Sequence, residues 1–135
     1  MYQQMIFVNL AVNDAAASKK FFTELGFSIN PQFSSDDTTC VVISETIIAM
    51  LLEKKRYSDF TKKEIADSAK TSEVLLCLSA ESREKVDELI NKAVAAGGTA
   101  NDDVQDQGFM YGRSFEDLDS HSWEVVWMDP AAVQG

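Results

Sequence analysis

Glu124 has the most unusual setting of the ionisable residues in the sequence, because it interrupts the apolar run from Trp123 to Met128. That run is rich in aromatic and β-branched residues and is typical of a strand. Side chains alternate across a strand, so Glu124 shares a face with Val126 and Met128 and points away from the two tryptophans. A carboxylate on such a face lies either at a wet edge or in a pocket, where it can act as a general base or bind a metal ion.

A second acid, Glu73, begins a strand predicted over residues 73–79. The apolar residues of the predicted strands need a helix-covered core, so the residues between them must turn away from it. We therefore expect an open sheet face that collects Phe7, Asn9, Glu73, Cys77 and Glu124. Two carboxylates that converge in a partly apolar cleft repel each other and lose hydration, which raises the pKa of at least one. A raised pKa suits a general acid or base, so Glu73 and Glu124 are the candidate catalytic pair.

Tyr111 and Arg113 share one face of the strand predicted over residues 110–115. An arginine beside a phenol can hold a carboxylate or phosphate bidentately, so both are candidate substrate-binding residues. The alternative is a structural ion pair between Arg113 and Asp117 or Glu124.

The sequence has a single histidine, His121, which lies in the turn before the last strand. It is either a further substrate-binding residue or a turn residue that bonds the loop backbone. Cys77 has no base near it in the sequence, so we expect it to behave as a small buried hydrophobe.

Composition excludes several classes of function. The chain has 135 residues, a net charge of −10 and 45% hydrophobic residues, as expected for one ordinary globular domain. The acidic balance argues against nucleic acid and anionic membrane surfaces as partners, because both require clustered Lys and Arg. The first residues do not resemble a signal sequence, and the two cysteines form no CxxC motif. A reduced, cytoplasmic protein is the simplest interpretation.

The order of predicted elements indicates one unit used twice. Strands at 6–12, 27–33, 38–44 and 47–52 surround a helix that begins at Asn13 or Asp14 and ends at Gly26. Strands at 73–79, 99–106, 110–115 and 123–128 surround a helix that begins at Ser82. We therefore predict a single α+β domain over residues 1–135, with βαβββ units at 5–54 and 73–129 joined by a segment at 55–72. The two units should form one curved mixed sheet with both helices on its convex side, and its open edges favour a homodimer. The polar stretch 54–72 is a candidate mobile lid or partner-contacting arm.

Three stretches carry a family resemblance: Val8–Asp14, the run Phe21-Phe22-x-x-Leu25-Gly26-Phe27, and Asp117–Val125. Together with the doubled βαβββ unit, they resemble the vicinal oxygen chelate superfamily. That superfamily holds glyoxalase I, extradiol dioxygenases, and fosfomycin- and bleomycin-resistance proteins. More narrowly, the chain is similar to the branch of predicted lactoylglutathione lyases.

The resemblance implies metal-ligand positions that this chain fills poorly. The family usually places His, Gln or Glu where this sequence has Phe7, Ile48 or Met50, Glu73 and Glu124. Only the two glutamates can coordinate, and one histidine cannot supply the 2-His-1-carboxylate site of an iron dioxygenase. No cofactor is therefore certain, although a hard divalent ion with mostly water ligands could bind between Glu73 and Glu124.

Two functions remain open. The first is a small-molecule-binding protein with a degenerate metal site, which sequesters a small cationic or amphipathic compound as bleomycin-resistance relatives do. The alternative is a metal-dependent lyase or isomerase of the glyoxalase type, with Glu124 or Glu73 as the base and Arg113 holding a small anionic substrate. The missing ligands favour the first.

Overall fold

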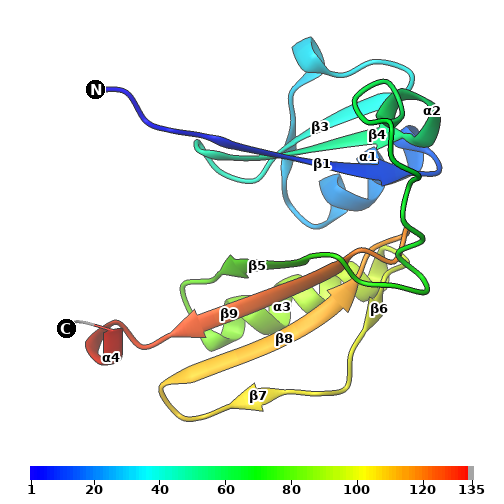
Figure 1. Cartoon of the computed structure of the whole chain (residues 1–135). Helices are drawn as coiled ribbons and strands as arrows, with labels where there is room; N and C mark the ends of the chain where they lie inside the picture. Colours follow the sequence, from blue (N-terminus) through cyan, green and yellow to red (C-terminus); the bar gives the residue numbers. More distant parts are fainter. Residues whose placement is uncertain (134–135) are drawn as a thin grey trace. The chain divides into compact units, whose positions relative to one another are not determined.

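The computed structural model describes residues 1–133, which form two compact units. The first unit spans Met1–Asp67 and the second begins at Ser68. Each unit is one sheet with a helix packed on one of its faces (Figure 1). No helix in the described part of the chain is long and apolar enough to cross a membrane.

The first unit is a four-stranded sheet in the order β1-β4-β3-β2. Its elements are β1 (Ile6–Val12), α1 (Ala15–Glu24), β2 (Ser28–Ile29), the 3-10 helix η1 (Pro31–Phe33), β3 (Thr38–Val42), β4 (Ile47–Glu53) and α2 (Lys54–Tyr57). Strand β1 runs parallel to β4, and the other neighbouring strands are antiparallel.

Helix α1 begins where Asp14 accepts hydrogen bonds from the backbone N–H groups of Ala16 and Ala17. These bonds satisfy donors that the first turn of a helix leaves free. The helix ends before Gly26, whose φ of 104° lies in the left-handed region that favours glycine. Its inward residues Phe21 and Phe22 are almost fully buried, and they complete the core on one face of the sheet.

The second unit repeats this arrangement with the sheet order β5-β9-β8-β6, and β7 also pairs with β8. Its elements are β5 (Leu75–Ser79), α3 (Arg83–Ala95), β6 (Thr99–Ala100), β7 (Gln105–Asp106), β8 (Met110–Glu116), β9 (Ser122–Met128) and α4 (Pro130–Val133). Strand β5 is parallel to β9, while β8 is antiparallel to β9.

The core of the second unit lies between α3 and one face of this sheet. Val86 and Ile90 of α3 are fully buried, as is Val125 of β9. The rings of Phe115 and Trp123 stack with their centroids 6.3 Å apart. This alternation leaves the opposite face of β9, which carries Glu124, turned away from α3.

The structure confirms the predicted α+β fold built from βαβββ units. The hydrogen bonds divide the strands into two sheets, one in each unit. Several predicted strands are also shorter than expected, and the strand predicted over 99–106 is two short strands, β6 and β7. Pro31 ends the strand predicted over 27–33, and the chain continues as η1. Strand β5 begins at Leu75 rather than Glu73.

Candidate functional site

Glu124 lies in the middle of β9 on the face that α3 does not cover. Its register partners are Cys77 on β5 and Ser114 on β8. The side chain is half-buried. Within residues 1–133, no hydrogen bond or ion pair reaches its carboxylate. A carboxylate in this setting has acceptor capacity that a ligand can use.

Cys77 is exposed, contrary to the expectation that it would be buried. The reason is its position on the open face beside Glu124, where no helix of the second unit covers it. Partial desolvation raises the pKa of the Cys77 thiol, and the negative charge of Glu124 raises it further. The thiol is therefore protonated at neutral pH and contributes to the face as a weak hydrogen-bond donor.

Three other residues predicted for the open face, Glu73, Phe7 and Asn9, are exposed. Glu73 is exposed and precedes β5, so it is outside the register that aligns Cys77 with Glu124. Phe7 and Asn9 belong to β1 of the first unit and are both exposed. The Asn9 side-chain amide donates a hydrogen bond to the Phe7 carbonyl over 3.3 Å. In the second unit, Glu124 is the half-buried acid at the centre of the open sheet face, and the exposed Glu116 lies on the same face at the end of β8.

Tyr111 and Arg113 point to the helix-covered face, away from Glu124. The hydroxyl of Tyr111 donates to Asp87 Oδ1 on α3 over 2.7 Å, and the guanidinium of Arg113 donates to the same oxygen over 2.9 Å. The Tyr111 hydroxyl and the Arg113 guanidinium lower the pKa of Asp87, and in return the pKa of Tyr111 is raised. Arg113 therefore forms a structural ion pair, and its partner is Asp87 rather than Asp117 or Glu124. The sequence could have indicated this orientation, because Phe115 lies two positions after Arg113 on the same face of the strand and is a core residue.

His121 lies in a turn that is organised around Asp117. The Asp117 carboxylate is 7% exposed and accepts hydrogen bonds from the backbone N–H groups of Asp119 and His121 and from Trp123 Nε1. Burial raises the pKa of Asp117, and the nearby His121 opposes this rise. The His121 ring contacts Ser68, with 3.2 Å between Nδ1 and the serine Oγ. The His121 backbone therefore forms part of this turn, and a substrate-binding role for its ring stays a prediction. The importance of Asp117 was missed from the sequence.

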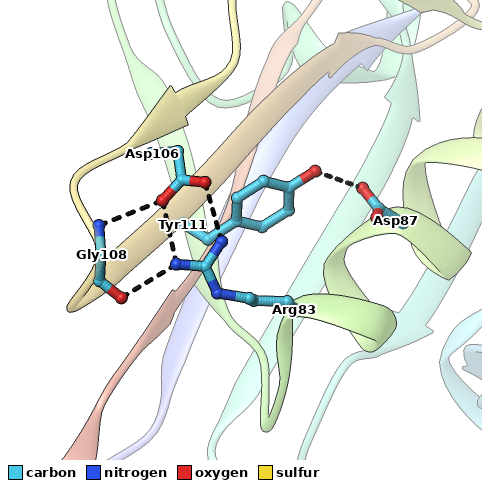
Figure 2. Close-up of polar contacts among 5 residues, drawn as sticks. All are labelled: Arg83, Asp87, Asp106, Gly108 and Tyr111. Carbon is cyan, nitrogen blue, oxygen red and sulfur yellow. Dashed lines mark hydrogen bonds and ion pairs between the residues drawn. The ribbon is translucent and has the colours of Figure 1, made fainter.

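Arg83 is a second residue that sequence reasoning missed. Its guanidinium donates to both carboxylate oxygens of Asp106, each over 2.9 Å, and to the Gly108 carbonyl (Figure 2). It also lies over the rings of Tyr111 and Trp127, 5.1 Å and 5.3 Å from their centroids. These contacts fasten β7 and its turn to the start of α3. Arg83 lowers the pKa of Asp106 to about 2.

A shallow hollow of about 540 Å³ lies on the outer surface of α3. It is lined by Glu84, Asp87, Glu88, Asn91, Lys92 and Ala95. Glu88 pairs with Lys92 over 3.0 Å, so part of its negative charge is already neutralised. Since Glu124 points away from α3, this hollow is not part of the candidate site.

The donor set does not fit a typical metal centre of this fold. No three His, Cys, Asp or Glu side chains come together to hold a metal ion anywhere in the described residues. The side chains in register with Glu124 are a protonated thiol and a hydroxyl, Cys77 and Ser114. Stable metal sites in proteins use deprotonated thiolates, imidazoles or several oxygen ligands. The side chains in register with Glu124 therefore add no anionic ligand to its carboxylate.

Comparisons with known proteins agree with this fold. Residues 4–44 match the family model described as bleomycin resistance protein-like N-terminal. The structure of hypothetical protein SA1046 from S. aureus is 30% identical, with 94% of each chain covered and a TM-score of 0.78. A glyoxalase-related enzyme from Fulvimarina pelagi is 19% identical over 93% of this chain and 88% of its own, with a TM-score of 0.77. A glyoxalase/bleomycin resistance protein/dioxygenase family enzyme from Burkholderia phytofirmans is 17% identical over 93% of this chain and 99% of its own, with a TM-score of 0.75.

A search of curated proteins gives no match. The solved structures, the family model and the doubled βαβββ fold nevertheless agree with one another. The chain therefore has the fold of the glyoxalase/bleomycin resistance/dioxygenase proteins, and its first part, residues 4–44, matches the bleomycin resistance protein-like family model.

Proposed function

We propose that this protein binds a small organic molecule on the open face of the β5-β9-β8 sheet, with Glu124 as the group that orients it. The single observation that supports this is the half-buried Glu124 carboxylate, which has no side-chain or backbone partner within the described residues. Burying a charge without a partner is unfavourable, so such a group is retained where a ligand supplies the partner. An ammonium, guanidinium or N–H group of the ligand is the natural counterpart of a carboxylate.

The surroundings of Glu124 indicate what the rest of the ligand resembles. Leu75 is 60% exposed and Met128 is 42% exposed, and Val126 lies between Glu124 and Met128 on the same face. Small-molecule sites combine apolar walls with a few oriented polar groups. The ligand is therefore a cationic or amphipathic compound with an apolar body. Sequestering such a compound requires no metal and no bond-making step.

A second candidate is a metal-dependent lyase or isomerase of the glyoxalase type that acts on a small anionic substrate. Its support is the position of Glu124 in the Asp117–Val125 motif and the fold shared with a glyoxalase-related enzyme. Glu124 would then act as the general base. Against this candidate, the cation expected to hold the substrate, Arg113, is engaged by Asp87 on the other face.

A thermal-shift screen, followed by calorimetry of any hits, separates the two candidates. The purified protein is tested against cationic amphipathic compounds, small anionic thioesters and divalent metal ions. We expect binding of a cationic compound that Glu124→Gln abolishes. The control Glu73→Gln removes the same charge from an exposed position and should leave binding intact. Equal binding by both variants, or none by the wild type, contradicts the proposal. A divalent ion retained on purification, together with turnover that Glu124→Gln removes, would establish the lyase instead.

We also infer that the protein is cytoplasmic and a homodimer. The dimer is supported by the sheet order, since β1 and β5 are the end strands of their sheets and open edges favour a partner. Sedimentation velocity over a range of protein concentrations tests the dimer directly.

A further inference from the structure

The open face of the second sheet changes in polarity along β8 and β9. These two strands lie side by side and pair over their whole lengths in antiparallel register (Figure 1). The pairs of residues that they turn away from α3 are, from one end to the other, Glu116 with Ser122, Ser114 with Glu124, Gly112 with Val126, and Met110 with Met128. The face is therefore acidic at one end and apolar at the other.

The acidic end of this face selects the charge of a ligand. Glu116 and Glu124 lie on neighbouring strands two positions apart in register, so they are diagonal neighbours on the face. No ion pair in the described part of the chain involves either carboxylate. Two carboxylates in this arrangement attract a cationic group and repel an anionic one. A fatty acid or another anionic amphiphile is therefore a poor fit.

The other end of the face is an apolar strip formed by Met110, Met128 and Val126. Met128 is 42% exposed, and Met110 and Val126 are half-buried. Gly112 has no side chain, and a Cβ at that position would lie 3.2 Å from Val126 Cγ2. Val126 therefore covers the Gly112 position on β8, and the strip is continuous across both strands. Methionine side chains adapt their shape to an apolar partner, so the strip suits a flexible alkyl chain.

The distance between the acid and the end of the strip sets the length of the chain. Met128 is the fourth residue after Glu124, which corresponds to about 13 Å along a strand. An extended alkyl chain advances about 1.3 Å per carbon, so about ten carbons span this distance. We propose that the ligand of Glu124 is a single-chain cationic amphiphile, an alkylammonium compound whose chain lies along β8 and β9. This inference rests on the proposed function and adds the shape and length of the ligand.

Isothermal titration calorimetry of the full chain with alkyltrimethylammonium salts tests the length directly. The series runs from butyl through hexyl, octyl and decyl to dodecyl, each below its critical micelle concentration. An open face buries only one side of the chain, so each added methylene should tighten binding roughly twofold up to decyl. Dodecyl should bind no more tightly than decyl, because its last carbons extend beyond Met128. Decanoate carries the opposite charge on a similar chain and should not bind.

Shortening the apolar strip should shorten the chain that the protein prefers. The double variant Met110→Gln with Met128→Gln places polar side chains of similar length at the end of the strip. Its affinity should stop rising at about hexyl, so that decyl binds at least roughly fivefold more weakly than to the wild type. The matched control is Val94→Gln, which replaces a 47% exposed side chain on α3 and should keep the wild-type dependence on chain length. Circular dichroism melts check that every variant is folded.

The outcomes separate this inference from the proposed function. If no alkylammonium salt binds, or if Glu124→Gln binds the series as tightly as the wild type, the proposed function fails and the inference fails with it. If Glu124 is required but affinity does not depend on chain length, or the methionine variant still prefers decyl, the inference alone fails. Benzyltrimethylammonium has the same head group on a flat, compact apolar group, and binding tighter than that of octyl would replace the alkyl chain with an aromatic ligand. Binding of decanoate would overturn the assigned charge.

Discussion

The buried Asp117 carboxylate makes a sharp prediction about stability. In Asp117→Asn, one amide oxygen still accepts the backbone N–H groups of Asp119 and His121, which lie 2.9 Å and 3.0 Å from Oδ1. The amide nitrogen then faces Trp123 Nε1, which donates to Oδ2 over 2.9 Å in the wild type. Two donors face each other, and the buried indole N–H loses its acceptor. A buried donor without a partner costs about 1–3 kcal/mol, so we expect a loss of that size in the free energy of unfolding.

Urea denaturation followed by tryptophan fluorescence measures this loss. The sequence contains two tryptophans, Trp123 and Trp127, and both belong to the second unit, so the signal reports the unit that holds Asp117. The midpoint should fall while the m-value stays constant. The control Asp102→Asn makes the same chemical change at an exposed position and should alter the free energy by less than about 0.5 kcal/mol.

A double-mutant cycle identifies the responsible hydrogen bond. Trp123→Phe removes the indole N–H, so adding Asp117→Asn to that variant should cost less than adding it to the wild type. We expect a coupling energy of about 1 kcal/mol between the two positions. If Asp117→Asn matched the Asp102→Asn control, or the coupling were zero, the carboxylate would not organise the turn as the structure indicates.

Three further predictions follow from the packing and charges of the second unit. Ile90→Ala removes a fully buried side chain from α3 and should lower the free energy of unfolding by about 2–5 kcal/mol, measured by urea denaturation. Arg83→Met removes the bonds to Asp106 and Gly108, so amide hydrogen exchange at β7 and its turn should quicken while the amides of β9 stay as slow as in the wild type. The lowered pKa of Asp106 means that its contribution to stability is complete above about pH 3.8 and is lost as the pH falls through about 2. An NMR titration of Asp106 with an ordinary pKa would contradict that link. Arg83→Met should raise the pKa of Asp106 toward its ordinary value, although the Gly108 N–H still bonds the carboxylate.

Alternation along strands could be predicted from the sequence and explains most of the fold. The pattern of apolar residues in 73–79 and 123–128 places Leu76 and Leu78 on the same side as Trp123 and Val125, and the observed register pairs them in that way. Helix boundaries could also be predicted, because Asp14 and Ser82 cap α1 and α3 as expected. These features depend on neighbours within a few residues, which the sequence displays directly.

Contacts between distant elements were harder to predict. Asp87 lies 24 residues before Tyr111 and 26 before Arg113. Their contact can be predicted only once it is known which face of α3 packs on which face of β8. Phe115 carried a usable signal, because a core aromatic two residues after Arg113 assigns that face to the helix side. The bonds of Arg83 to Asp106 and Gly108 depend on how β7 folds back on β8, which short polar strands do not specify.

The internal repeat and strand alternation together predict that residues from both units share one open sheet face. The observed register pairs Phe7 with Ile48 in one sheet and Cys77 with Glu124 in the other, in both cases across parallel strands. Each sheet belongs to one unit, so the grouping of residues from both units on one face stays a prediction. The two units differ at the centre of the sheet face that their helices leave open. Strand β9 of the second unit carries the charged Glu124 there, whereas β4 of the first unit carries Ile48 and Met50. The polar recognition proposed for this protein therefore depends on one side chain of the second unit, and substituting Glu124 tests it without any assumption about the first.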